Sequence, residues 1–215
     1  MSVIVTLCLY DGIVMAADSR VTITKTYLNG NQEVSYEDGE KKIFQFGDRN
    51  IGISWCGYAM VGDESIPDYL NGLYYRLKPN ATIKDIAEKI NEECINKVKG
   101  ESIRCHIAGY ENGTQCFYKV EDGVVTQGNM NPKLDITTMC IVWDGIRNIS
   151  GSIIRNKEKL EIGGRLVDES DIPSFTLDEG DKFARAMLKR TCVEREECGE
   201  PIYSLIITFD GMQWK

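Results

Sequence analysis

Apolar residues occupy nearly every position of two short segments near the start of the chain, 3–9 and 12–17. The turn Tyr10-Asp11-Gly12 separates them. A continuous apolar run of this length between turn residues is typical of a strand that is buried on both faces. Next comes the polar stretch "YLNGNQEVSY", whose Asn-Gly pair is a common hairpin turn. The pattern therefore predicts a buried hairpin followed by a polar one.

The remainder of the chain alternates between groups of strands and pairs of helices. In 65–77 the apolar residues recur at helical spacing, and a helix beginning at Thr82 opens with "TIKD", a variant of the capping box with Asp at its fourth position. A full capping-box pattern, Thr176 to Glu179, opens "TLDEGDKFARAMLKR". The other predicted elements are the strands "KKIFQF", "NIGISWCG", 103–109, 115–120, 123–127, 137–143 and "IYSLIITF", the helix 145–157 and a final turn "DG".

Strands and helices that come in groups indicate an α+β protein rather than alternating βαβ units. Apolar strands of this kind are buried when two sheets stack face to face and helices cover both outer faces. The chain has no long linker, internal repeat or low-complexity tract. We therefore predict one domain, residues 1–215, with two stacked, mainly antiparallel sheets flanked by helices.

Composition narrows the range of partners. The formal net charge of −8 disfavours binding to nucleic acid or to an anionic membrane. No apolar run is long enough to span a bilayer, and the N-terminus lacks the basic start of a signal peptide. Most of the eight cysteines lie in apolar, strand-like runs, no CxxC occurs, and His106 is the only histidine, so a zinc site has little support. We expect a reduced, cytoplasmic protein.

Candidate chemistry lies at the N-terminus. A serine hydroxyl needs a base to take its proton, and removal of Met1 would expose the α-amino group of Ser2 as that base. A nearby lysine would favour the neutral amine by charge repulsion, and a carboxylate would hold the lysine. Asp18 at the end of the second strand and Lys42 in "KKIFQF" fit these roles. Taken singly, they could equally be an ordinary terminal serine, a turn residue and a solvated lysine.

Together, Ser2, Asp18 and Lys42 match the pattern of a known family. "DGIVMAADSRVT" resembles the start of proteasome β subunits and their bacterial proteasome-like relatives, which are N-terminal nucleophile (Ntn) hydrolases. The resemblance implies the four-layer αββα sandwich of that class. In its register the nucleophile falls on Ser2, the carboxylate on Asp18 and the lysine on Lys42. Serine replaces the more common threonine.

The same resemblance assigns further roles. "ISWCGYAMVGD" places Gly57 as the backbone donor to the oxyanion, and Trp55 and Ala59 at the substrate pocket. The resemblance also puts Val21 at that pocket. Trp55 either closes that pocket against large side chains or fills the core. "WDG" puts Asp144 where the family has an assisting serine. In "CVEREECGEP" either Glu194 or Glu197 would support the amine, or both are surface acids.

These features suggest a proteasome-like peptidase that acts on peptides or unfolded protein and needs no metal or organic cofactor. The resemblance implies a homo-oligomeric ring; ring size and any ATPase partner stay open. One alternative is an Ntn amidohydrolase for a small amide. Another is a non-catalytic structural subunit that retains Met1.

Overall fold

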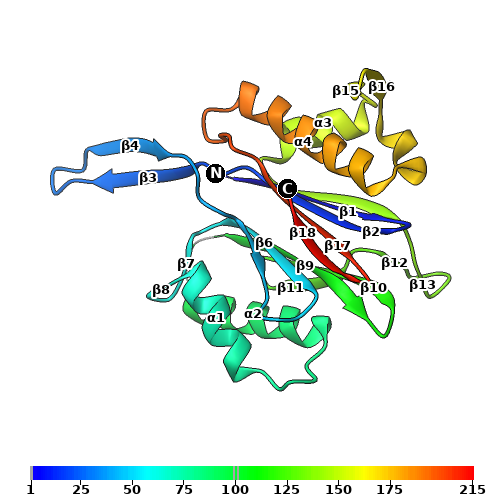
Figure 1. Ribbon diagram of the computed structural model, residues 1–215. Helices are drawn as coiled ribbons and strands as arrows, with labels where there is room; N and C mark the ends of the chain where they lie inside the picture. The colour runs from blue at the N-terminus through cyan, green and yellow to red at the C-terminus, as the bar shows by residue number, and fades with distance from the viewer. Residues whose placement is uncertain (1, 99, 101) are drawn as a thin grey trace.

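The computed structural model describes residues 2–98, 100 and 102–215 (Figure 1). Its first sheet has five strands in the order β14-β1-β2-β17-β18, and every neighbouring pair is antiparallel. The buried pair predicted from the sequence lies at its centre. The strands are β1 (Val3–Leu9), β2 (Gly12–Ala17), β14 (Cys140–Gly145), β17 (Tyr203–Thr208) and β18 (Gly211–Trp214).

The second sheet also has five antiparallel strands, in the order β11-β10-β9-β6-β5. Its central strand, β9, brings together segments that are about fifty residues apart in the chain, because Trp55 lies opposite Cys105. The strands are β5 (Ile43–Gln45), β6 (Ile51–Gly57), β9 (Ile103–Glu111), β10 (Thr114–Glu121) and β11 (Val124–Gln127).

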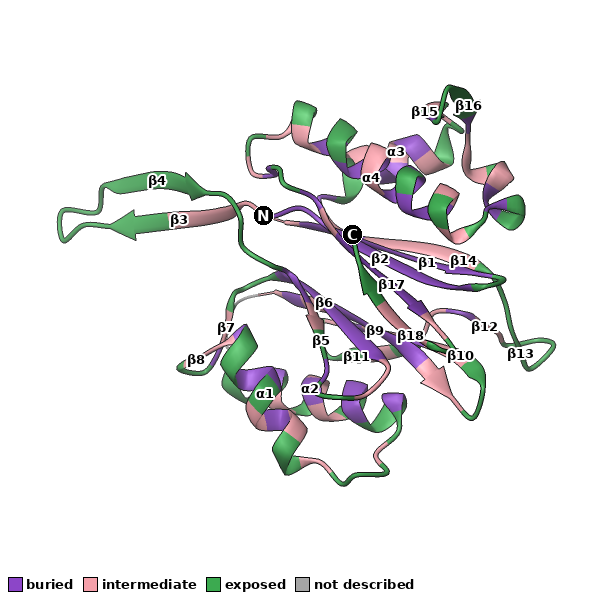
Figure 2. Ribbon diagram, in the orientation of Figure 1, coloured by how far each residue is buried: buried purple, intermediate pink, exposed green. Residues whose placement is uncertain are grey.

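The two sheets face each other, and helices cover their outer faces (Figure 1). Helices α3 (Arg147–Arg155) and α4 (Leu177–Glu194) lie on the first sheet, and α1 (Ile66–Arg76) and α2 (Ile83–Lys97) on the second. Strand β1 explains the continuous apolar pattern. Val3, Val5 and Leu7 pack into the core beneath α3 and α4, whereas Ile4 and Cys8 pack between the sheets. Both faces of the strand are buried, as Figure 2 shows.

The predicted helix starts are confirmed. Thr82 accepts a hydrogen bond from the backbone N–H of Asp85, and the Asp85 carboxylate accepts one from the N–H of Thr82. Thr176 and Glu179 form the same reciprocal pair at the start of α4.

The antiparallel sheets and their helices confirm the predicted mixed architecture. Among the described residues no helix is both long and apolar enough to cross a membrane.

The predicted polar hairpin is formed by β3 (Val21–Thr26) and β4 (Gln32–Glu37), which project from the body as an exposed arm (Figure 2). Several strands of two or three residues show no periodicity and could not be predicted from the sequence, and a six-residue 3-10 helix was also missed. Sequence analysis also expected only a turn at the end of the chain, where β18 pairs with β17. The missed elements are β7 (Met60–Val61), β8 (Glu64–Ser65), β12 (Met130–Asn131), β13 (Ile136–Thr137), β15 (Leu160–Ile162), β16 (Arg165–Val167) and the 3-10 helix η1 (Glu169–Ser174).

Candidate active site

Asp18 and Lys42 form a buried ion pair. The Lys42 Nζ lies 2.8 Å from Asp18 Oδ1, and it also donates to the backbone carbonyl of Arg20 at 2.6 Å. The Asp18 carboxylate accepts three backbone N–H groups besides, from Val3 at 2.8 Å, Arg20 at 3.1 Å and Gly199 at 3.3 Å. Asp18 is fully buried. Backbone donors therefore fix the carboxylate, and the carboxylate holds the lysine.

Ser2 immediately precedes β1 and is held beside this pair. Its carbonyl accepts a hydrogen bond from the Ile146 N–H at 3.1 Å, and the next peptide N–H, that of Val3, donates to Asp18 Oδ1. The same oxygen atom thus accepts the Val3 amide and the Lys42 ammonium. Since side chains alternate along a strand, Ser2 and Ile4 belong to the face that points toward the second sheet. Met1 lies outside the described residues.

A cavity of about 610 Å³ opens beside Ser2 and Lys42. It lies between the base of the β3–β4 arm, the end of β6 and the start of α1. Its lining is mostly apolar, with charged groups toward the arm. The lining includes Ser2, Val21, Glu37, Glu40, Lys41, Lys42, Phe44, Trp55, Cys56, Gly57, Ala59, Met60, Ile66 and Pro67.

Gly57 ends β6 in the left-handed region, with φ of +99°. A Cβ atom there would lie 2.2 Å from the Ser102 carbonyl oxygen, so the position requires glycine. The Trp55 N–H donates to Lys42 O on one side of the strand, and the Tyr58 N–H donates to Ser102 O on the other. Because successive N–H groups of a strand alternate, the Gly57 N–H points to the Lys42 side, toward the cavity.

All three residues expected at the substrate pocket line this cavity: Val21, Trp55 and Ala59. The Trp55 ring is also part of the core beneath α1 and α2, where it meets Tyr69 edge-to-face at 6.3 Å, and its indole N–H donates to Tyr58 O at 2.9 Å. One side chain therefore serves core and cavity wall together. The two alternatives drawn from the sequence are not exclusive.

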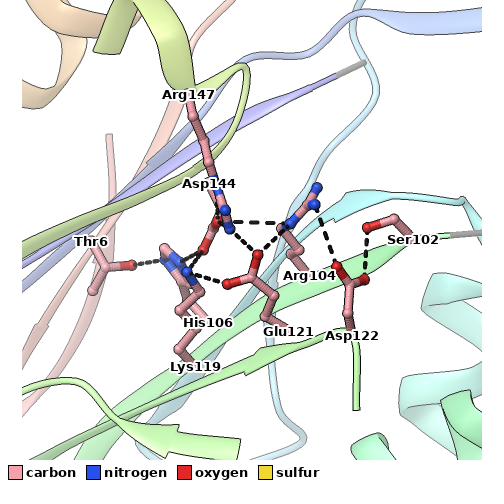
Figure 3. Close-up of polar contacts among 9 residues, drawn as sticks. All are labelled: Thr6, Ser102, Arg104, His106, Lys119, Glu121, Asp122, Asp144 and Arg147. Carbon is pink, nitrogen blue, oxygen red and sulfur yellow. Dashed lines mark hydrogen bonds and ion pairs between the residues drawn. The ribbon is translucent and has the colours of Figure 1, made fainter. Parts of the chain in front are cut away.

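Asp144 does not line this cavity. Its buried carboxylate lies between the sheets, where Oδ2 contacts His106 Nε2 at 3.0 Å and Lys119 Nζ at 2.9 Å, and Oδ1 accepts from Arg147 Nε at 2.8 Å (Figure 3). Burial alone would raise the pKa of Asp144, but the bonds from His106, Lys119 and Arg147 hold it well below its ordinary value. The role expected for Asp144, in place of an assisting serine, has no side-chain contact to Ser2 among the described residues to support it.

Glu194 and Glu197 also lie apart from the cavity lining. Glu194 ends α4 and pairs with Arg190 at 2.6 Å. The late loop nevertheless reaches the site through its backbone, because the Gly199 N–H donates to Asp18 and the Glu196 carbonyl accepts from Arg20. Sequence reasoning looked for an acid there and missed the peptide groups, since nothing in a residue's identity reveals where its backbone N–H points.

The fold is similar to that of two solved proteins. One is described as "Anbu (ancestral beta-subunit) from Yersinia bercovieri", with a TM-score of 0.63 and 14% identity over 99% of this chain and 86% of the other. The second is an "Anbu (Gly-1) mutant" from Hyphomicrobium sp. strain MC1, with a TM-score of 0.67 and 14% identity over 100% and 87%. No family model and no curated protein matches the sequence.

These findings correct the relationship expected from the motif. A close relationship to proteasome β subunits and bacterial proteasome-like peptidases is wrong, because the two similar structures named above are Anbu proteins, a distinct proteasome-like family, and the likeness supports a remote proteasome-like fold at most. At 14% identity the likeness shows the fold alone. The twelve-residue motif marks a remote, shared fold rather than membership of the proteasome β family.

Proposed function

We propose that this chain is an N-terminal nucleophile hydrolase that cleaves amide bonds of peptides with Ser2 once Met1 is removed. One observation carries the proposal. Asp18 Oδ1 accepts both the peptide N–H that follows Ser2 and the Lys42 ammonium, at the edge of a cavity that Ser2 itself lines. The paired sheets and their helix layers then correspond to the four-layer αββα sandwich of Ntn hydrolases.

The proposed first step transfers the acyl group to the enzyme. Ser2 Oγ attacks the substrate carbonyl carbon while its proton passes to the free α-amino group of Ser2. As the tetrahedral intermediate collapses, the C–N bond breaks and the same proton goes to the leaving amine. Water then adds to the ester, the C–O bond to Ser2 breaks, and the serine hydroxyl is restored. An ammonium has three N–H donors, and the two contacts that Lys42 makes among the described residues leave the third for the amine or the substrate.

The neighbouring groups support this division of roles. The Gly57 N–H, directed to the Lys42 side of β6, would stabilise the developing oxyanion. Cys56 lines the same cavity and is a competing nucleophile in principle. Burial, however, raises the pKa of the Cys56 thiol to about 12, so it is protonated at neutral pH. The hydroxyl of Ser2 is thus the better candidate.

Peptides suit the cavity better than very small amides. A volume of about 610 Å³ accommodates a side chain together with the flanking backbone, and the apolar lining favours apolar residues. One structural neighbour is described as an "ancestral beta-subunit", that is, a subunit of an assembly. We extend that to this chain as a homo-oligomer, to be checked by light scattering.

The test compares the parent protein with Ser2→Ala on fluorogenic peptides and on small amides such as glutamine. We expect the parent to hydrolyse peptides, and Ser2→Ala to lose activity by about 10³-fold or more, since the nucleophile is gone. Alanine keeps the small second residue that permits Met1 removal. Equal activity of the two proteins would overturn the proposal. Turnover of small amides alone would overturn the choice of peptides.

A further inference from the structure

Thr6, His106 and Asp144 form a hydrogen-bonded chain between the sheets (Figure 3). The Thr6 Oγ1 lies 2.9 Å from His106 Nδ1, and His106 Nε2 lies 3.0 Å from Asp144 Oδ2. Burial lowers the pKa of His106, although Asp144 opposes the effect, so the ring is neutral and carries one N–H. An ionised Asp144 can only accept, and therefore Nε2 donates to it and Nδ1 accepts from Thr6.

This order of groups resembles a catalytic triad, but it is not a second active site. Thr6, His106 and Asp144 are each fully buried, so a substrate could not reach the hydroxyl. Within the cluster, it is Asp144 that lies near the candidate active site. Asp144 lies opposite Ile4 in the register of β1 and β14, and Gly145 lies opposite Val3. The cluster therefore sits at the end of β1 that begins with Ser2.

The turn 144–147 joins this cluster to Ser2. Arg147 is the first residue of α3, and its guanidinium bonds back to the Asp144 carboxylate, with Nε to Oδ1 at 2.8 Å. Between the two bonded residues lie Gly145 and Ile146. The Ile146 N–H donates to the Ser2 carbonyl, and a Cβ on Gly145 would lie 1.7 Å from that oxygen.

The other members of the cluster brace the turn against the second sheet. His106 on β9 and Lys119 on β10 both contact Asp144, and Glu121 on β10 contacts Lys119 and Arg147. The whole group is fixed by side chains from both sheets and from α3 (Figure 3). Ser2 is attached to this turn through its backbone carbonyl, which accepts from the Ile146 N–H, so its position depends on how the turn is held.

We propose that Asp144 and Arg147 are positioning residues for the Ser2 nucleophile, which they act on through the Gly145–Ile146 backbone. The inference rests on the proposed function of Ser2. Asp144 thereby influences the same nucleophile that sequence analysis linked it to, but without touching the amine. Because the turn contacts Ser2 rather than the substrate cavity, its loosening should slow the chemical step and leave substrate binding unchanged.

The test uses three variants of the full chain: Arg147→Ala, which opens the turn; Lys119→Ala, which removes a brace outside the turn; and Arg155→Ala, an exposed residue at the other end of α3. For a fluorogenic peptide we expect Arg147→Ala to lower kcat by about ten- to a hundredfold with KM within about twofold, the scale of a small misplacement. Lys119→Ala should cost less than about threefold, and Arg155→Ala should match the parent. Equal losses in Arg147→Ala and Lys119→Ala, or an unchanged kcat in Arg147→Ala, would overturn the proposal.

A second readout separates this inference from the proposed function. Hydrogen exchange of the Ile146 amide, followed by NMR, should accelerate in Arg147→Ala and not in Arg155→Ala, while the Asp18-bonded amide of Val3 stays protected. A parent without activity but with this exchange pattern would refute the proposed hydrolase and support the link from the turn to Ser2. An active parent whose Ile146 exchange is the same in Arg147→Ala would refute the link alone.

Discussion

Two buried aspartates flank the start of β1, and they are held in different ways. Asp18 accepts three backbone N–H groups and one cation, Lys42, which lines the cavity. Asp144 contacts side chains from three elements, His106, Lys119 and Arg147, and lies away from the cavity. The Asp18 carboxylate is held mainly by backbone N–H groups, whereas the Asp144 carboxylate is at the centre of a network of side chains.

The difference indicates that the two aspartates have different roles. A carboxylate fixed by peptide groups keeps its place when a side chain nearby is exchanged, so it can hold a lysine that takes part in chemistry. A carboxylate surrounded by bonded side chains has no remaining contact to offer a substrate, and it joins elements instead. We therefore expect changes around Asp18 to affect catalysis first, and changes around Asp144 to affect stability and positioning.

Apart from loss of the nucleophile itself, the largest effect should come from Lys42→Ala. Loss of the ammonium beside Ser2 should lower kcat/KM by about 10²- to 10⁴-fold, because the Ser2 amine that transfers the proton would no longer be kept neutral. The fold should survive, because the three backbone donors still satisfy Asp18. Peptide turnover and circular dichroism check the two parts, with the exposed Lys189→Ala on α4 as control. A Lys42→Ala variant with parental turnover would remove Lys42 from the mechanism.

A smaller effect should follow from Trp55→Ala. This variant tests the cavity next to the Asp18–Lys42 pair. If the indole limits the pocket, the parent should prefer peptides with Ala before the scissile bond over those with Tyr. Removing the ring should then improve the Tyr substrate relative to Ala by about 1–3 kcal/mol in kcat/KM, the usual scale of size discrimination. Steady-state kinetics on the two peptides measures this. Equal turnover of both by the parent would refute the role of Trp55 in selectivity.

The smallest effect should be on the pH dependence of the free energy of unfolding, and it should come from His106, which contacts Asp144. Burial keeps the pKa of His106 below its ordinary value of 6.5, so below about pH 6.5 the unfolded chain binds a proton that the folded chain does not. Stability should therefore fall with decreasing pH by at most about 1.4 kcal/mol per pH unit from this group. Glu121 stays ionised in that window, because Lys119, Arg104 and Arg147 outweigh burial and lower its pKa to about 2.

His106→Gln removes this titration and should flatten the curve between pH 7.5 and 5.5. Urea unfolding of both proteins at several pH values measures the slope. Parallel curves would contradict the assignment of the acid sensitivity to His106.

Elements whose signal is local could be predicted from the sequence. A short stretch of consecutive residues carries the pattern of each such element. Examples are the buried hairpin of β1 and β2 and the capping boxes at Thr82 and Thr176, which the structure has as predicted. The sequence also pointed to Ser2, Asp18 and Lys42, whose grouping depended on a family register rather than on spacing. Their roles stay predictions, although the structure places all three together.

What the sequence could not supply depends on tertiary contacts. The Gly199 N–H reaches Asp18 from 181 residues away, and neither residue type signals the contact. His106 was noted only as the single histidine, since its partners Thr6 and Asp144 lie on two strands of the opposite sheet. The short pairs β12–β13 and β15–β16 are too brief to show a pattern.

The central claim is that Ser2 is an exposed N-terminal nucleophile, and covalent labelling followed by mass spectrometry tests it most directly. The intact mass shows whether Met1 is gone, and a peptide epoxyketone or β-lactone then reports on the reactive group. We expect a chain that begins at Ser2 and one adduct per chain, mapped to Ser2 and absent in Ser2→Ala. A chain that retains Met1 and takes no label, or an adduct on a cysteine with Ser2 unmodified, would contradict it.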